Sequence, residues 1–182
     1  MTLLNKAASH LVIIDIQERL APAIANEAAA LKATLLLVAA ARRLGVPISV
    51  TEQYPKGLGG TVAPLRAALG EDAALFEKMH FSAMREVEFA QHLAQAQRQT
   101  LIICGMEAHV CVLQTALDAK AAGYEVALVA DAVGSRLEQS REIALKRAMQ
   151  AGLAVVTAEM VVFEWLQRAG TDDFKSIAPL LK

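Results

Sequence analysis

Short apolar segments alternate with longer helix-like segments along this chain, and this alternation most constrains its fold. Most of the six apolar segments are apolar at successive positions, which is typical of strands covered on both faces. They span Leu11–Ile16, Val46–Thr51, Ala73–Glu77, Thr100–Cys104, Glu125–Ala130 and Leu153–Val156. Because helices connect them, the alternation predicts one parallel sheet with a helix layer on each face.

Glycines close several of the helix-like segments. Asn26 is a candidate N-cap for a helix that runs to about Leu44, where Gly45 ends it. The segment Glu52–Val62 contains three glycines and a proline and is interpreted as a loop over a site, although an exposed loop without function fits equally well. Six more helices are expected at Pro64–Leu69, Glu86–Gln97, His109–Ala122, Gln139–Ala151, Glu159–Ala169 and Phe174–Leu180.

Length and composition support a single folded domain over residues 1–182. With 55% hydrophobic residues, the chain buries enough apolar surface to exclude intrinsic disorder. The predicted architecture is a three-layer α/β/α sandwich on a six-stranded parallel sheet, with the Rossmann-like strand order 3-2-1-4-5-6.

The charge and the cysteine content limit which classes of binding partner and which cellular compartment are expected. A net charge of −1 gives no basic excess for a phosphate backbone, so no nucleic-acid partner is expected. The longest apolar stretch is interrupted by Lys32 and Thr34, so no membrane span is expected. Polar Asn5, Lys6 and His10 precede the first strand, so no signal peptide is expected. Two cysteines cannot form a disulfide framework, which favours a cytoplasmic location.

Two residues carry candidate chemistry. Asp15 follows the first apolar strand, where open α/β sheets place their ligand crevice, although an aspartate that caps a turn fits equally well. Cys111 falls in the first turn of the helix after the fourth strand, where unpaired N–H groups and the helix dipole favour a thiolate. A buried structural cysteine is the alternative, and it describes Cys104 better.

The predicted strand order brings Asp15 and Cys111 to the same crevice, because strands 1 and 4 flank the switch point. Lys78 follows strand 3 and lies two strands from Asp15, so only a long side chain or a returning loop brings it to the site. No dinucleotide fingerprint, Walker A sequence or histidine pair with metal-ligand spacing is present, so neither a metal nor another cofactor is expected.

Together these residues resemble the isochorismatase-like cysteine hydrolases over nearly the whole chain. The resemblance is closest to the isochorismatase domain-containing subgroup, in which the segment Thr51–Val62 (TEQYPKGLGGTV) looks typical. The other matching motifs are Asp-x-Gln at residues 15–17, Lys78 followed by Phe81-Ser82, GMEAHVCV at residues 105–112 and Asp131-Ala132.

The resemblance implies a catalytic triad of Asp15, Lys78 and Cys111. In this triad Cys111 attacks the substrate, Asp15 moves the proton, and Lys78 keeps Asp15 ionised and lowers the thiol pKa. The resemblance also implies a metal-independent cysteine hydrolase that cleaves a small amide or imide C–N bond. Vinyl-ether hydrolysis of an isochorismate type, using Asp15 without the thiol, and a non-catalytic interaction protein are the alternatives.

The resemblance also implies a cis peptide between Met106 and Glu107, with backbone N–H groups of Glu107 and Cys111 as oxyanion donors. Its remaining site residues are Ala108 in the same loop and Gln17, Tyr54 and Phe81 as substrate-binding residues.

Two departures from relatives limit what is carried over. Nicotinamidases of this superfamily have an Asp-x-His metal site after strand 2, and Thr51–Tyr54 (TEQY) lacks the histidine. The carrier domain often attached to isochorismatases is not found either, so the motifs do not identify the small-molecule substrate. The alanine-rich helices and the apolar residues Val161, Val162 and Phe163 predict a homo-oligomer, as relatives of this fold also self-associate.

Overall fold

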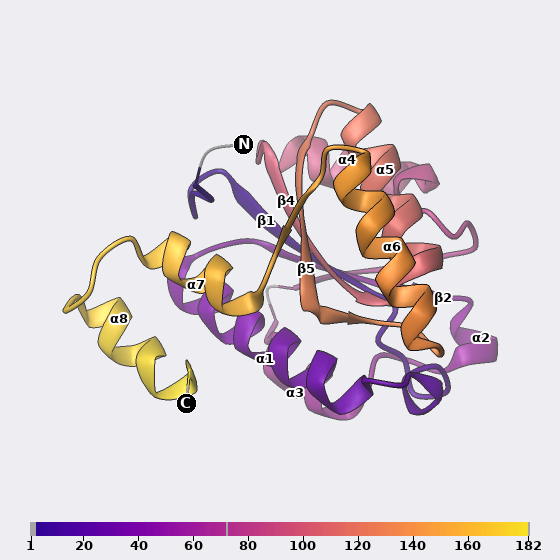
Figure 1. Cartoon of the computed structure of the whole chain (residues 1–182), viewed down its shortest axis with the longest axis horizontal. Helices are drawn as coiled ribbons and strands as arrows, with labels where there is room; N and C mark the ends of the chain where they lie inside the picture. The colour runs from indigo at the N-terminus through magenta and orange to yellow at the C-terminus, as the bar shows by residue number, and fades with distance from the viewer. Residues whose placement is uncertain (1–2, 72, 182) are drawn as a thin grey trace.

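The computed structural model describes residues 3–71 and 73–181, which form a six-stranded parallel sheet between helices (Figure 1). The strands lie in the order β3-β2-β1-β4-β5-β6, which confirms the predicted order. Their bounds are β1 (Ser9–Ile14), β2 (Ile48–Gln53), β3 (Ala74–Lys78), β4 (Thr100–Met106), β5 (Glu125–Gly134) and β6 (Ala154–Val156).

The α-helices are α1 (Glu27–Leu44), α2 (Pro55–Leu58), α3 (Ala63–Leu69), α4 (Val87–Gln95), α5 (Leu113–Ala121), α6 (Glu138–Gln150), α7 (Ala158–Leu166) and α8 (Asp172–Ile177). Seven of them lie where the sequence predicts helices, whereas α2 lies in the segment Glu52–Val62, for which a loop is expected. Short 3₁₀ segments are η1 (Ala21–Ala23), η2 (Ala83–Arg85) and η4 (Ala178–Leu181). Among the described residues, no helix is both long enough and apolar enough to cross a membrane.

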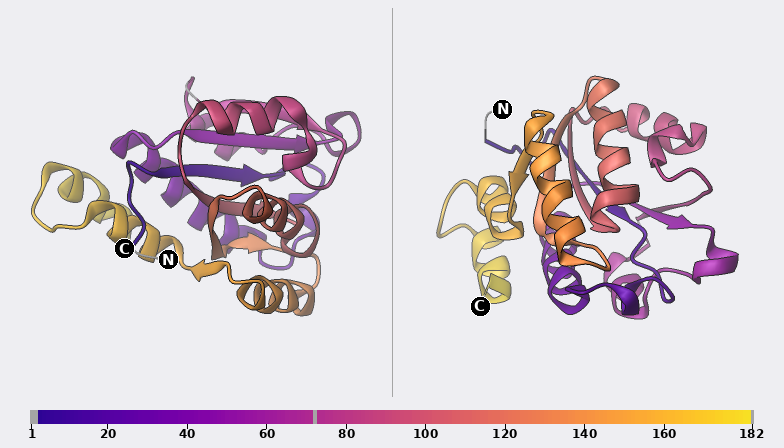
Figure 2. Two further views of the ribbon diagram at one scale, coloured as in Figure 1. Left: turned by 90° about the horizontal axis from the view of Figure 1, so that it is seen from above. Right: turned by 45° about the vertical axis from the view of Figure 1, so that its right-hand side comes forward.

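Helices cover both faces of the sheet. Figures 1 and 2 show α1, α3 and α7 on one side and α4, α5 and α6 on the other. In β1, Leu11 and Ile13 belong to the first core, whereas Val12 and Ile14 belong to the second. Successive strand residues point to opposite faces, so both sets of neighbours must be apolar. This explains the continuous apolar runs in the sequence.

The switch point of the sheet lies between β1 and β4. These strands pair in parallel, with Ile14 opposite Gly105. Gly105 has a φ of 118°, and a Cβ atom there would lie 2.0 Å from the Ile14 carbonyl oxygen. Only glycine permits this backbone approach. The end of β1 and the segment after β4 are therefore held side by side.

The strand boundaries differ from the predicted ones at the edge that carries the site. β1 ends at Ile14 because Asp15 adopts a left-handed backbone with a φ of 50°. β4 continues to Met106 rather than ending at Cys104, because Gly105 and Met106 pair with the end of β5 after a register shift. This extension positions Glu107 directly beyond the sheet.

Two local expectations are wrong. The segment after β4 begins with a π-helical turn, η3 (Ala108–Val112), so Cys111 does not lie in the first turn of an α-helix. Such turns are frequent at functional sites. Asn26 precedes α1 but makes no side-chain cap, because its amide donates to the carbonyl of Val133 in β5 at 3.0 Å.

Candidate active site

Asp15 lies at the switch point, directly after β1, and is fully buried. Its backbone N–H donates to the Thr51 carbonyl at 3.1 Å, which continues the pairing with β2. The Thr51 hydroxyl donates to Asp15 Oδ1 at 2.7 Å. These two bonds fix the carboxylate at the carboxyl edge of the sheet.

Lys78 reaches Asp15 across β2. Its side chain is fully buried, and Nζ lies 2.8 Å from Asp15 Oδ2. The same nitrogen donates to Gln53 Oε1 at 2.6 Å and to the carbonyls of Phe81 and His80 at 3.1 and 3.3 Å. Lys78 ends β3, opposite Gln53 in the register. Its long side chain therefore extends across β2, the strand that separates β3 from Asp15.

Cys111 completes the cluster. The charges of Asp15 and Lys78 both act on its thiol, and the residue is 5% exposed. Asp15 has no exposed surface and Lys78 has 2%, so all three residues of this cluster are buried. The structure therefore brings together the three residues that the resemblance implies as a triad.

Burial decides the protonation of the thiol. It raises the pKa of Cys111 to about 12, and the negative charge of Asp15 acts in the same direction, while Lys78 opposes both. The expected thiolate is therefore a wrong prediction for this arrangement, because desolvation of the charged form outweighs the nearby cation. At neutral pH Cys111 is a thiol beside a carboxyl group.

The same burial acts on Asp15. Desolvation raises the pKa of its carboxyl group, and the charge of Lys78 and the hydrogen bonds from Lys78, Thr51 and Cys111 oppose the rise. A carboxylate with a raised pKa is a stronger base than an ordinary aspartate. This suits Asp15 to exchange a proton with Cys111.

The loop before Cys111 has the expected geometry. The peptide bond between Met106 and Glu107 is cis. The Glu107 carboxylate is nearly buried and turns to Arg136, whose Nε donates to Oε2 at 3.1 Å and whose backbone N–H donates at 2.9 Å. Met106 and Ala108 are fully buried in opposite cores. The negative charge of Glu107 is thereby paired away from the thiol.

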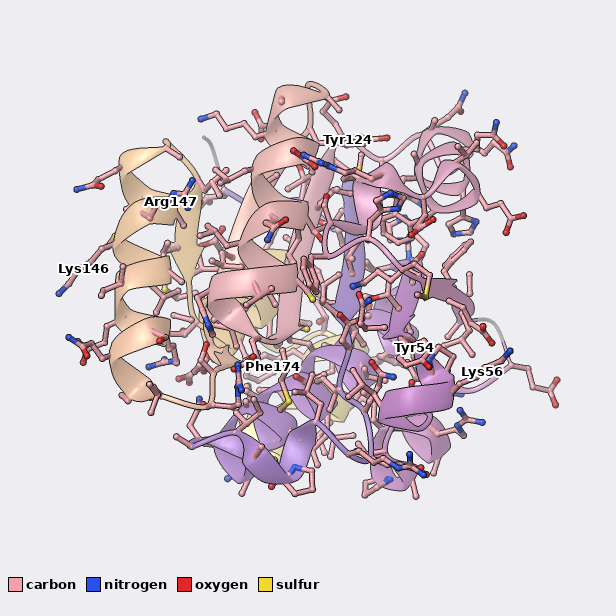
Figure 3. All side chains as sticks on the ribbon, turned by 90° about the vertical axis from the view of Figure 1, so that its right-hand side faces the viewer. Tyr54, Lys56, Tyr124, Lys146, Arg147 and Phe174 are labelled. Atoms are coloured by element: carbon pink, nitrogen blue, oxygen red, sulfur yellow. The ribbon has the colours of Figure 1, made fainter. Side chains whose placement is uncertain are left out.

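The three predicted substrate-binding residues occupy different environments. Tyr54 and Phe81 are about half exposed, at 48% and 54%, and Tyr54 lies beside Lys56 at the outer edge of α2 (Figure 3). Gln17 is fully buried and donates both amide hydrogens to the carbonyls of Gln53 and Gly59. We therefore assign Gln17 to holding the loop rather than to contacting a ligand.

Gln53 was not singled out from the sequence, although its Oε1 makes the shortest contact to Lys78. The signal available was its position at the carboxyl end of β2, next to the strand that carries Asp15.

The main apolar groove lies away from Asp15, Lys78 and Cys111. This groove, of about 500 Å³, runs along α1, α7 and the C-terminal segment, and none of the three residues lines it. Within the described part of the chain, no three His, Cys, Asp or Glu side chains are grouped as metal ligands.

The fold and the buried carboxylate, ammonium and thiol define an α/β protein with a polar site at the switch point of its sheet. The chain belongs to the isochorismatase domain family, whose model matches residues 9–160. The chain is 38% identical to the "Secreted isochorismatase effector Isc1" of Phytophthora sojae, covering 96% of this chain and 85% of the relative. Identity is also 38% to "Isochorismatase domain-containing protein 2" of Danio rerio, with 98% and 89% covered.

Solved structures agree with this family. The MAR1 ribonuclease of Caenorhabditis elegans superposes with a TM-score of 0.93 at 37% identity, covering 99% of this chain and 92% of that one. The YcaC gene product of Escherichia coli, described as an octameric hydrolase of unknown specificity, gives 0.92 at 26% identity, with 100% and 90% covered. The chain thus has the isochorismatase-like hydrolase fold.

Selective alkylation tests the environment of Cys111. We expect iodoacetamide to modify Cys111 before Cys104, because Cys104 has no exposed surface and burial also raises its pKa to about 12. The rate at Cys111 should climb about tenfold per pH unit from pH 7 to pH 9, since the thiolate fraction does. Mass mapping of the labelled peptides measures both. A plateau below pH 8, or faster labelling of Cys104, would contradict this assignment.

Proposed function

We propose that this protein is a cysteine hydrolase that cleaves a small amide or imide C–N bond. The observation that carries the proposal is the buried ion pair of 2.8 Å between Lys78 and Asp15, with the Cys111 thiol close enough for both charges to act on it. A nucleophile, a base and a cation that holds the base in place are the groups that acyl transfer needs.

In the first step the Asp15 carboxylate takes the thiol proton as Cys111 Sγ attacks the carbonyl carbon. The carbonyl oxygen becomes an oxyanion, for which the backbone N–H groups of Glu107 and Cys111 are the proposed donors. When the tetrahedral intermediate collapses, the C–N bond breaks, and protonated Asp15 returns its proton to the leaving nitrogen. A thioester on Cys111 remains.

In the second step a water molecule attacks the thioester carbon, and Asp15 takes one of its protons. The C–S bond breaks, the product leaves as a carboxylic acid, and Cys111 regains its proton from Asp15. Lys78 stays charged throughout and holds Asp15 at the reacting atoms. Both steps are complete with Cys111, Asp15, the substrate and one water molecule. The proposed mechanism therefore uses no metal or cofactor.

Vinyl-ether hydrolysis is a second candidate, which the family and the isochorismatase name of the Phytophthora sojae relative favour. A protonated Asp15 would donate to the enol-ether carbon, and the raised pKa of its carboxyl group supports such an acid role. This reaction does not use the thiol of Cys111.

A substrate screen tests both proposals. The purified protein is offered small amides, imides and ureides, isochorismate and a single-stranded RNA, each with and without EDTA. The RNA is included because a structural relative is described as a ribonuclease. The Cys111→Ala protein is the control for every substrate.

Each outcome of the screen has a defined meaning. Amide or imide turnover that requires Cys111 and resists EDTA supports the proposal. Isochorismate turnover that survives Cys111→Ala supports the second candidate. Turnover of RNA alone, activity that EDTA removes, or no turnover by a folded protein contradicts the first proposal, and the last result favours a non-catalytic interaction protein.

We also propose that the protein is a homo-oligomer. The octameric structural relative supports this, as do the exposed Met160 and Phe163 on α7. Val161 and Val162, which the sequence also predicts as part of this surface, are fully buried in the core and offer none. Multi-angle light scattering at micromolar concentration should give at least twice the chain mass of 19.4 kDa, whereas a monomer mass would refute it. The cytoplasmic location expected from the cysteine content stays a prediction.

A further inference from the structure

We propose that Gln53 is the positioning residue that holds the Lys78 ammonium against Asp15 and connects it to the loop over the site. The inference rests on the proposed function for its catalytic meaning. The contacts of Gln53 support it independently, because its backbone N–H and carbonyl and its side-chain Oε1 and Nε2 each make a hydrogen bond. Gln53 lies at the end of β2, between the strands that carry Lys78 and Asp15.

The Lys78 ammonium has three hydrogens and four oxygen neighbours within 3.3 Å. Two of these neighbours are backbone carbonyls of His80 and Phe81, which belong to the turn that follows Lys78 itself. The other two, Asp15 and Gln53, come from separate strands. Gln53 Oε1 makes the shortest contact, at 2.6 Å, and it is neutral. The full charge of Lys78 is therefore left to act on Asp15.

The amide of Gln53 has one possible orientation. Nζ of Lys78 only donates hydrogen bonds, and the carbonyl of Met79 only accepts, so Oε1 must face Lys78 and Nε2 must face Met79. The second bond measures 3.0 Å. A rotated amide would place an NH₂ group against an ammonium. The two neighbours of the amide therefore require that Oε1, and not Nε2, faces Lys78.

The backbone of Gln53 connects this amide to the loop. Gln17 Oε1 accepts from the Gln53 N–H at 2.8 Å, and Gln17 Nε2 donates to the Gln53 carbonyl at 3.0 Å and to the Gly59 carbonyl at 2.7 Å. Two further bonds, from the N–H groups of Glu18 and Arg19, hold the carbonyls of Gly60 and Leu58. A continuous hydrogen-bonded path therefore runs from Gly59 through Gln17 and Gln53 to Lys78 and Asp15.

The path makes a measurable prediction about Cys111. Asp15 and Lys78 are the charged groups that act on its thiol, and they act in opposite directions. In Gln53→Glu a second carboxylate shares the Lys78 charge, so the thiolate of Cys111 becomes harder to form. In Gln53→Met a side chain of similar length offers no acceptor, so the ammonium is no longer held in place.

The experiment measures alkylation of Cys111 by iodoacetamide, a neutral probe, at pH 8. Each unit of higher pKa lowers the thiolate fraction about tenfold, and the greater nucleophilicity of a more basic thiolate offsets about half of this on a logarithmic scale. We expect at least about a threefold slower reaction in both variants. Gln91→Glu, at an exposed position of α4, makes the same charge change away from the site and should match wild type.

Labelling of Cys104 separates positioning from general loosening of the fold. A merely structural role of Gln53 would lower the melting temperature and speed the labelling of both cysteines. Positioning instead slows Cys111 selectively, and Cys104 stays unreactive. If Gln53→Glu does not fold, Gln53→Met alone decides.

A Gln53→Met protein that labels Cys111 at the wild-type rate would overturn the proposal, even if Gln53→Glu is slower. The assay requires no substrate. A failed substrate screen therefore leaves this test of Gln53 intact, and a failed Gln53 test leaves the hydrolase proposal standing on Asp15, Lys78 and Cys111.

Discussion

Lys78→Met is expected to lower turnover by about 10²–10⁴-fold, the usual contribution of a positioned general base. Methionine keeps most of the buried volume but removes the charge that faces Asp15 at 2.8 Å. Burial then raises the pKa of Asp15 without opposition from Lys78, so a smaller fraction of the carboxyl group is in the basic form. Steady-state kinetics on the substrate found in the screen measures the loss.

The same substitution should destabilise the fold, by up to about 3–5 kcal/mol, because it leaves a buried acidic group without its cationic partner. In the variant the folded pKa of Asp15 lies above its unfolded value. Stability is then fully present below about pH 4, where both states are protonated, and is lost as the pH rises through the folded pKa. Chemical denaturation at pH 4 and pH 7 should show the larger deficit at pH 7.

A double variant supplies the control. Lys78→Met with Asp15→Asn removes both charges, so we expect stability near wild type at pH 7 and no recovery of turnover. Equal turnover in Lys78→Met and wild type would remove Lys78 from the proposed triad. A stability deficit that is the same at both pH values would mean that Asp15 does not keep its proton in the variant.

Cys111→Ala is expected to abolish amide or imide hydrolysis, with a loss of at least about four orders of magnitude, since no group remains to form the thioester. The substitution leaves Asp15 and Lys78 in place. Hydrolysis of a vinyl ether, which uses Asp15 alone, should survive it. Burst-phase and steady-state assays of the same preparation on both substrate types distinguish the two reactions.

Cys104→Ala is the matched control for the thiol, because Cys104 lies buried in the core on β4, where its thiol donates to the Val12 carbonyl at 3.9 Å. It should retain turnover. Amide hydrolysis that persists in Cys111→Ala would rule out covalent catalysis by this residue. Loss of activity in Cys104→Ala with the fold intact would mean that the nucleophile was assigned to the wrong cysteine.

Much of the fold could be predicted from the chain alone. Continuous apolar runs such as that of β1 occur where both faces of a strand are covered, and the glycine after α1 marks a helix end that the structure contains. The site was harder to derive. Position at the ends of strands 1 and 4 pointed to Asp15 and Cys111, whereas Lys78 entered only through a family resemblance.

The sequence by itself determined the layered parallel sheet and the family resemblance, because apolar periodicity and local motifs are properties of neighbouring residues. The strand order was assumed from the doubly wound pattern, and the structure confirms it. Tertiary structure alone decided three features of the site. Lys78 crosses β2 to reach Asp15, Gln53 accepts from it, and burial keeps the Cys111 thiol protonated. These three features depend on how far side chains reach and on how distant segments exclude solvent from the site. The local order of residues encodes neither of these two causes.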